Sequence, residues 1–381
     1  MIGDLRAQEA ALLKGEQRLG DLLDRYGSTG VTEAMEMLIA YSERKTRAAI
    51  AAIPNGSYEF EDYMDHDGFK LNKPVKIKCR LEVFDDCLRF DFTGTDPQVQ
   101  GAINATMSLT WTTVFVCVSC ILPDDVPFNE GMTRAIEVHA PEGAIINPRP
   151  PAPVNVRSVT LQRIVDAVLG APVQAVPERF GAQSCGVVVG VSFGGVDPRT
   201  GKNFVFYEAY CGALGGTRSG DGADGINCGV ANPQNIPAEV AEMNYPIRIH
   251  RFELVRDSGG SGEFRGGLRL KPEYEMLAET ATFNVRGERS AFAPRGSHGG
   301  GNGSLSTAFL EGDDGKMHPI PSKFGGQTQR GRRLVVIQSG GGGFGGPARR
   351  NRASLKSDYL DGKMSAGKIK QDFGVDITTG G

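Results

Sequence analysis

The segment "RDSGGSGEFRGGLRL", residues 256–270, contains five glycines, three arginines and two carboxylates. A glycine loop that binds phosphate must lead from a strand into a helix, because the helix N-terminus holds the anion. Here the glycines lead into "LRLKPEYEML", which is strand-like and contains a proline. The similar segment "SGGGGFGGP", residues 339–347, is followed by two arginines rather than a helical pattern. We therefore interpret residues 256–270 as a glycine-built turn between strands, not as a nucleotide-binding loop.

Glycine dominates the composition, with 52 of 381 residues. That is about twice the usual share of roughly 7%. The glycines have no collagen-like period and lie between apolar, strand-like runs. They predict a β-rich protein with many tight turns.

Hydrophobic periodicity predicts helices at the N-terminal end of the chain, followed by a hairpin and two further helices. Residues 4–53 have apolar side chains at helical spacing, interrupted by "YGSTG" at residues 26–30. In residues 75–92 the period changes to two, which predicts a β-hairpin with one buried face. Residues 107–125 and 159–176 again have helical patterns.

The predicted fold class is α+β. A length of 381 residues suits more than one domain. We place a helical N-terminal segment at residues 1–55 and an α+β domain at residues 56–180. A β-rich domain with glycine turns and short C-terminal helices follows at residues 181–381.

Composition also restricts the class of partner. Charge is nearly balanced, with 42 basic and 45 acidic residues, so no nucleic-acid partner is predicted. The longest apolar run, residues 112–122, is shorter than the roughly 20 residues of a membrane span, so no membrane partner is predicted. Seven cysteines without framework spacing predict reduced thiols in a cytoplasmic protein.

Six motifs in collinear order resemble one family. They are "DFTGTDPQVQGAINA", "PFNEGMTRAIEVHAPEGAIINPRPPAPV", "LQRIVDAVLGA", "YEAYCGALGG", "YPIRIHRFELVRDSGGSGEFRGG" and "SGGGGFG". Together they resemble the hydantoinase B/5-oxoprolinase family, the HyuB-type subunits of ATP-dependent cyclic-amide hydrolases. Relatives occur in acetone and acetophenone carboxylases. The resemblance covers residues 3–375.

The resemblance implies a divided enzyme. A HyuA-type partner subunit is expected to bind ATP and Mg²⁺ and to phosphorylate the lactam oxygen. This chain would then host hydrolysis of the activated amide, with a small-molecule substrate such as a hydantoin or 5-oxoproline. Family members usually carry a further N-terminal part with His- and Asp-rich motifs, which do not occur in this sequence. The chain is therefore expected to be a split subunit, a truncated reading frame or one polypeptide of a larger complex. In a complex, a second polypeptide is expected to supply that half, and any divalent metal is expected outside this chain.

Two loops depart from the family pattern. Residues 225–237, "GINCGVANPQNIP", replace two family histidines with Asn227 and Gly229. Residues 184–190, "SCGVVVG", lack the paired asparagines of the family motif. Loops usually carry function, so these departures predict a different substrate or an inactive chain.

The segment "GGTRSGDGADG", residues 215–225, supplies the predicted site. Gly215 and Gly216 would let backbone N–H groups approach a substrate, and Arg218 would bind a carboxylate or phosphate oxygen. Asp221 and Asp224 would be catalytic, by orienting the substrate amide or an attacking water. The alternative is a loop ordered by its own turns and by an Arg218–Asp221 ion pair.

Asn155 and Arg157 form a second candidate for substrate binding. They precede a predicted helix, whose N-terminus attracts anions. The alternative is a simple capping role for these residues.

No metal site is predicted within this chain. Cys117 and Cys120 have C-x-x-C spacing but lie in an apolar helix without further ligands, so we interpret them as core cysteines. His66, between Asp65 and Asp67, could bind a metal, but a solvated turn is the preferred interpretation.

Two further functions stay open. The chain could belong to an ATP-dependent ketone carboxylase of the acetone or acetophenone type. It could also be a non-catalytic structural or assembly subunit, which the altered loop at residues 225–237 would explain.

Overall fold

The computed structural model describes residues 2–210, 212–226 and 228–378. Its elements confirm the predicted α+β class: one long helix, a helix-covered sheet, two facing sheets and two C-terminal helices. The predicted boundaries after residues 55 and 180 fall between elements. None of the described helices is long and apolar enough to cross a membrane.

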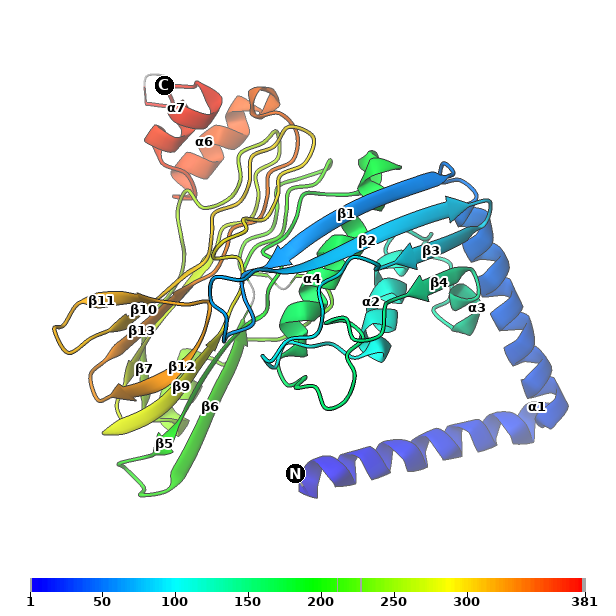
Figure 1. Cartoon of the computed structure of the whole chain (residues 1–381), viewed down its shortest axis with the longest axis horizontal. Coiled ribbons are helices and arrows are strands. Elements are labelled where there is room, and N and C mark those ends of the chain that lie inside the picture. Colours follow the sequence, from blue (N-terminus) through cyan, green and yellow to red (C-terminus); the bar gives the residue numbers. More distant parts are fainter. Residues whose placement is uncertain (1, 211, 227, 379–381) are drawn as a thin grey trace.

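Helix α1 (Ile2–Ile50) projects from the body of the protein (Figure 1). It bends at Gly27, which has a φ of 73°, inside the segment predicted to interrupt the helix. The half before the bend is mostly exposed, and the half after it packs on α3 (Glu130–Thr133). A Cβ on Gly131 would lie 2.0 Å from the carbonyl oxygen of Ile39, so glycine permits this close contact.

A four-stranded sheet follows, in the order β1-β2-β3-β4. Strands β1 (Gly56–Met64), β2 (Val75–Phe84) and β3 (Cys87–Asp91) are antiparallel, and β4 (Ile136–His139) is parallel to β3. Side chains along β2 alternate between buried and half-buried, which confirms the predicted hairpin with one buried face. Helices α2 (Met107–Ser119) and α4 (Arg157–Gly170) cover that face (Figure 1).

Two antiparallel sheets form the second half. One has the order β12-β9-β5-β6, and the other has the order β11-β10-β13-β8-β7. Phe193 and Phe206 of the first sheet contact Tyr274 of the second, with ring centroids 5.9 and 6.0 Å apart, so the sheets share one core. The strands are β5 (Val189–Val196), β6 (Asn203–Tyr210), β7 (Ile247–Leu254), β8 (Leu270–Met276), β9 (Thr280–Arg286), β10 (Thr307–Glu311), β11 (Met317–Ile320), β12 (Lys323–Gln329) and β13 (Arg333–Ile337).

Extended segments without strand assignment run from these sheets to α6 (Arg352–Leu360) and α7 (Ala366–Phe373) (Figure 1). We call them the glycine bundle, defined as residues 181–186, 212–225, 258–267, 294–304 and 339–346. The remaining short helices are α5 (Ala238–Asn244), η1 (Pro172–Gln174), η2 (Pro177–Arg179) and η3 (Pro347–Arg349).

Backbone hydrogen bonds tie the glycine bundle together. The amide of Gly341 donates to Gly267 at 3.0 Å, and the amide of Gly267 donates to Leu214 at 2.8 Å. The amide of Gly216 donates to Gly342 at 2.8 Å. Segments far apart in the sequence therefore satisfy one another's backbone groups, as strands of a sheet do.

Close packing explains why these segments consist of glycine. A Cβ on Gly266 would lie 1.9 Å from the carbonyl oxygen of Gly341, and one on Gly303 would lie 2.2 Å from that of Gly340. No side chain fits at such distances. The prediction for residues 256–270 is therefore half confirmed: they join β7 to β8 and lead into no helix, but they cross the glycine bundle instead of forming a tight turn.

We predict that Gly341→Ala destabilises the protein strongly, because its Cβ would lie 2.0 Å from the carbonyl oxygen of Leu214. Overpacking of this kind typically costs about 1–3 kcal/mol of unfolding free energy, and occasionally more. Gly346→Ala in the same segment is the control, since no atom lies within 4 Å of its Cβ position. Thermal unfolding of both variants checks this, and equal melting temperatures would contradict it.

Candidate functional site

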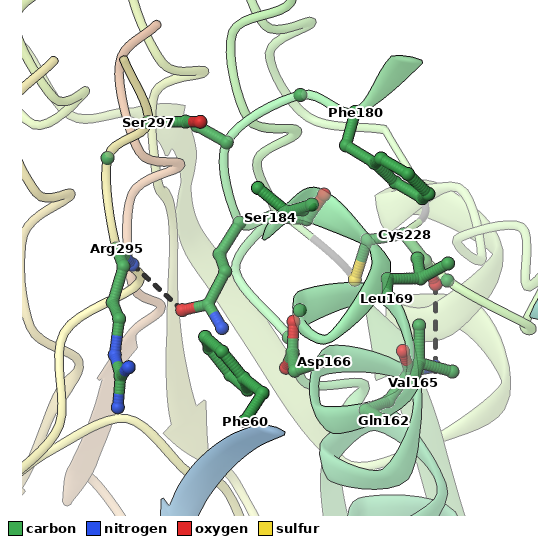
Figure 2. A pocket seen from close by; sticks show the side chains of 18 residues that line it. Phe60, Gln162, Val165, Asp166, Leu169, Phe180, Ser184, Cys228, Arg295 and Ser297 are labelled. Atoms are coloured by element: carbon green, nitrogen blue, oxygen red, sulfur yellow. Dashed lines mark hydrogen bonds between the residues drawn. The ribbon is translucent and has the colours of Figure 1, made fainter. Parts of the chain in front are cut away.

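A cavity of about 240 Å³ lies where α4 meets the glycine bundle (Figure 2). Its volume is below the roughly 300–1,000 Å³ of sites for drug-sized ligands, so it suits a small molecule. One wall is apolar and the other is polar, which is the usual composition of a ligand site.

The apolar wall comes from three elements. Val165 and Leu169 are four residues apart and so share one face of α4. Phe60 of β1 and Phe180, which follows η2, complete the wall (Figure 2). These side chains can pack against the hydrocarbon part of a ligand.

The polar wall contains a fixed amide. Gln183 accepts a hydrogen bond from the Arg295 amide at 2.9 Å, and its Nε2 donates to Asp62 at 3.1 Å. The Arg295 guanidinium lies over the Phe60 ring, 4.8 Å from its centroid, and the side chain reaches the rim of the cavity. The wall therefore offers an oriented amide near a cation.

Four buried charges lie directly behind this wall. Arg163 contacts Asp62 at 3.0 Å and Asp166 at 2.9 Å. Arg289 contacts Asp62 at 3.2 Å and Asp166 at 2.8 Å. The group, which we call the ion network, has no net charge and joins β1, α4 and the segment after β9. A buried network is stable only when every charge is paired in this way.

The backbone at the ion network is strained and closely packed. Arg289 has a φ of 68°, which costs an ordinary L-residue about 1–2 kcal/mol. Gly186 has a φ of 61°, and a Cβ there would lie 2.7 Å from Oδ2 of Asp166. Its carbonyl accepts a hydrogen bond from Arg163 at 3.1 Å. Only glycine lets this segment line the cavity beside the ion network.

The two aspartates of the ion network differ as acids. Burial opposes ionisation of Asp62, but Arg163 and Arg289 outweigh it and lower its pKa. For Asp166 burial is the larger effect, and its pKa is raised despite the same arginines. Asp166 also lines the cavity, so it is the carboxylate best placed to exchange a proton with a bound ligand.

The two loops that depart from the family pattern meet at this cavity. Ser184 and Gly186 line it from one loop, and Cys228 and Gly229 line it from the other. A Cβ on Gly229 would lie 2.1 Å from Oε1 of Gln162, and this glycine has a φ of 63°. Asn227, the other replaced position, lies outside the described residues.

Comparisons with known proteins agree with this architecture. Residues 1–347 match the sequence profile described as Hydantoinase B/oxoprolinase. The chain belongs to the hydantoinase B/oxoprolinase family.

The relatives of this hydantoinase B family member include named enzymes. It is 32% identical to the beta subunit of caprolactamase from Pseudomonas jessenii, with 100% of this chain and 67% of that protein covered. It is 31% identical to the B component of a putative D-/L-hydantoinase from Pseudomonas sp. strain NS671, with 99% and 65% covered. The chain thus spans about two thirds of the length of these relatives.

Solved structures place the fold in the same group. The crystal structure of the ATP-dependent caprolactamase from Pseudomonas jessenii matches 100% of this chain with a TM-score of 0.89 and 29% identity, and 67% of that chain is covered. A nucleotide-free structure of acetone carboxylase matches 94% of this chain and 54% of its own, with a TM-score of 0.78 and 15% identity. The second likeness shows the fold alone.

The predicted catalytic aspartates of this family member do not line the cavity. Asp221 pairs with Arg350 at 2.7 Å and accepts the Arg265 amide at 2.6 Å. Asp224 pairs with Arg265 at 3.0 Å and with Lys363 at 3.2 Å. Burial opposes ionisation of both, but the arginines outweigh it and both pKa values are lowered. Their contacts attach the C-terminal segment to the glycine bundle, and a catalytic role stays a prediction.

The predicted binding residues of the same segment are also separate from the cavity. Arg218 is exposed in a turn, and the ion-pair partner of Asp221 is Arg350, so the alternative Arg218–Asp221 pair is wrong. Gly216 accepts a hydrogen bond from Ala182, and a Cβ on Gly215 would lie 1.9 Å from the Ala182 carbonyl oxygen. The two glycines therefore support the cavity wall from behind.

Asn155 and Arg157 lie at the opposite end of α4 from the cavity. Both are exposed, and Arg157 donates to the Val154 carbonyl at 3.4 Å. The N-cap residue is Val156, without a side-chain hydrogen bond, so the capping alternative is not realised. Substrate binding by this pair stays a prediction.

The interpretation of His66 as part of a solvated turn is wrong. Asp65, His66 and Asp67 are all buried. Nδ1 of His66 accepts the Gly68 amide at 3.0 Å, and burial followed by the Lys323 charge lowers its pKa. Asp65 and Asp67 act in the opposite direction, but burial and Lys323 outweigh them.

The two cysteines at the C-terminal end of α2 differ in burial. Cys117 is buried in the core, as predicted, but Cys120 is exposed. Within the described residues, no group of three or more His, Cys, Asp or Glu side chains has the arrangement of a metal site.

We predict that Arg289→Met destabilises the protein by about 3–5 kcal/mol, because two buried aspartates would share one guanidinium. Arg149→Met is the control, since its pair with Glu142 is exposed and worth at most about 1 kcal/mol. Urea unfolding at neutral pH measures both, and equal midpoints would contradict the prediction.

The stability that Asp62 contributes through the ion network decreases at acidic pH. The folded-state pKa of Asp62 is lowered, so its contribution to stability is complete above the unfolded value of about 4. It is lost as the pH falls through the folded value.

Proposed function

We propose that this chain binds the activated ring of a cyclic amide in the cavity between α4 and the glycine bundle. In this proposal it is the substrate-side part of an ATP-dependent hydrolase of the hydantoinase, caprolactamase or 5-oxoprolinase type. The observation that carries the proposal is the cavity itself. It combines an apolar wall, an oriented Gln183 amide and a carboxylate, Asp166, whose pKa is raised.

Each wall has a part in the proposed reaction. The methylene groups of the ring pack against Val165, Leu169 and Phe60. The side-chain amide of Gln183 and the backbone at Ser184 orient the polar edge of the ring. Asp166 accepts the proton of the water that attacks the activated carbonyl carbon, which its weakened acidity favours.

ATP does not fit the glycine segments of this chain. Many of their amides donate to backbone carbonyls of neighbouring segments, and at many of the glycines a Cβ would overlap a neighbouring carbonyl oxygen. We therefore assign ATP and Mg²⁺ to a HyuA-type partner subunit, and any further divalent metal to another polypeptide. A cytoplasmic location is part of the same proposal.

The exposed half of α1 supports an assembly. Leu5, Leu12, Leu19 and Tyr26 recur every seven residues and are all exposed. An apolar stripe of this length on a projecting helix is typical of an interface. We propose that the polypeptide supplying the rest of the family architecture covers it.

Two alternatives have separate tests. A ketone carboxylase would hydrolyse ATP only with a ketone and bicarbonate, and would not open lactams. A non-catalytic assembly subunit is favoured by the ion pairs that occupy Asp221 and Asp224. It would join the complex, but cavity variants would not change turnover.

We predict that Leu169→Trp lowers ATP-dependent ring opening by about a hundredfold in the assembled complex, because the indole fills the cavity and displaces the ring. Leu360→Trp, at an exposed position of α6, is the control and should leave turnover unchanged. Product formation is measured with hydantoin, caprolactam and 5-oxoproline. Equal turnover of both variants would contradict the assignment of the cavity.

We predict that Leu12→Asp/Leu19→Asp weakens assembly by about a hundredfold, because each leucine loses roughly 1.5–3 kcal/mol of burial. Arg6→Gln/Lys14→Gln is the matched control, since it changes the net charge equally at exposed positions on the other side of α1. Native mass analysis of tagged complexes measures assembly. A chain recovered alone in every variant, including the unmodified one, would contradict the hetero-oligomer.

A further inference from the structure

Two cysteine side chains contact each other inside the cavity wall. The Sγ atoms of Cys185 and Cys228 are 3.3 Å apart, and the residues are 0% and 2% exposed. A disulfide has an S–S distance of about 2.05 Å, so the sulfurs need to approach by only about 1.3 Å. The two residues are 43 positions apart, which makes this a tertiary contact of two separate segments.

Cys228 is also the member that a small molecule can reach. Cys228 lines the cavity (Figure 2). Cys185 is not among the lining residues and is fully buried in contact with Cys228. A reagent as small as hydrogen peroxide enters a cavity of about 240 Å³ without any opening of the fold. The pair therefore combines contact between the sulfurs with access from one side.

Cys185 and Cys228 are expected to have different roles in oxidation. The hydrogen bond with Cys228, followed by burial, raises the pKa of Cys185 well above its usual value. Cys185 therefore keeps its proton, and Cys228, which lines the cavity, is the thiol assigned to react first with an oxidant.

We propose that Cys185 and Cys228 form an oxidant-sensitive modification site that closes to a reversible disulfide. Hydrogen peroxide first transfers one oxygen to Cys228, giving the sulfenic acid, and hydroxide leaves and takes up a proton to form water. The Cys185 thiol then attacks the Cys228 sulfur, forming the S–S bond and releasing a second water. Two thiols and one peroxide thus become one disulfide and two waters, and an added dithiol reverses the change.

Closure changes the cavity wall. It joins the loop at residues 182–186 to the loop at residues 225–237, and both contribute lining residues. The disulfide would then hold Cys228, which lines the cavity, covalently to Cys185. The site lies beside the proposed substrate position but does not depend on what binds there.

The remaining described cysteines lack this arrangement. Cys79 is buried in the sheet core, and Cys87 contacts Arg47 and Asp86. Cys117 is buried and Cys120 is exposed on the same helix. Among the cysteines that the structure describes, the pair in the cavity wall is therefore the best placed to close.

The test uses the intact chain treated with hydrogen peroxide, alkylated, and digested with trypsin without reduction. Trypsin separates the two cysteines into the peptides 180–199 and 219–248, each with one cysteine. We expect these peptides joined, with the loss of two hydrogens, and separated again by dithiothreitol. Alkylation of both thiols after peroxide, or a link from Cys228 to another peptide, would overturn the proposal.

Two cysteine variants test whether the link depends on Cys228. Cys228→Ser should abolish the link and leave Cys185 open to alkylation only after unfolding. Cys120→Ser, an exposed position, should leave the link unchanged. Where Cys228→Ser fails to fold, the wild-type peptide map alone decides. Recovery of a stoichiometric metal ion with both thiols protected from alkylation would overturn the disulfide in favour of a metal site.

Discussion

The pairing of two buried arginines with two buried aspartates holds the molecule together at its centre. Asp62 and Arg289 are 227 positions apart in sequence, yet both belong to one neutral network. Burying four charges is unfavourable unless each is paired, so the network is formed only when β1, α4 and the segment after β9 are all in place. It therefore fixes the position of the sheet-and-helix half against the sandwich half. The cavity lies at that junction, and Asp166 of the ion network lines it.

The glycine bundle imposes the second constraint, which is steric. Its segments approach so closely that a single Cβ would overlap a neighbouring carbonyl oxygen. This close approach lets every segment form backbone hydrogen bonds with another segment, although they do not form a regular sheet. The bundle presents residues 181–186 and 295–297 to α4 as a rigid wall. Much of the glycine composition thus shapes a scaffold.

Local patterns predict the elements well, because hydrophobic period is a local property. The bend of α1 at Gly27, the hairpin of β2 and β3 and the presence of α4 all follow from it. The predicted helix at residues 159–176 is too long, because α4 ends at Gly170 and the short helix η1 follows. The site could not be predicted in this way. The glycine-rich segment around Asp221 suggests a catalytic carboxylate, but its partner Arg350 is 129 residues away. The useful signal was the departure of two loops from the family pattern, since both loops reach the cavity.

Electrostatics across the cavity favour one orientation for a ligand. The cavity meets the C-terminal part of α4, whose dipole adds negative potential, and the Asp166 carboxylate adds more. Burial is the largest cause of the raised pKa of Asp166, and the charge of Asp62 adds to it. At the opposite side the Arg295 guanidinium provides positive charge. In the proposed reaction, an anionic activating group therefore faces Arg295 at the rim while the neutral ring lies deeper, along Leu169. That orientation leaves the activated carbon between the rim and the one carboxylate able to take a proton.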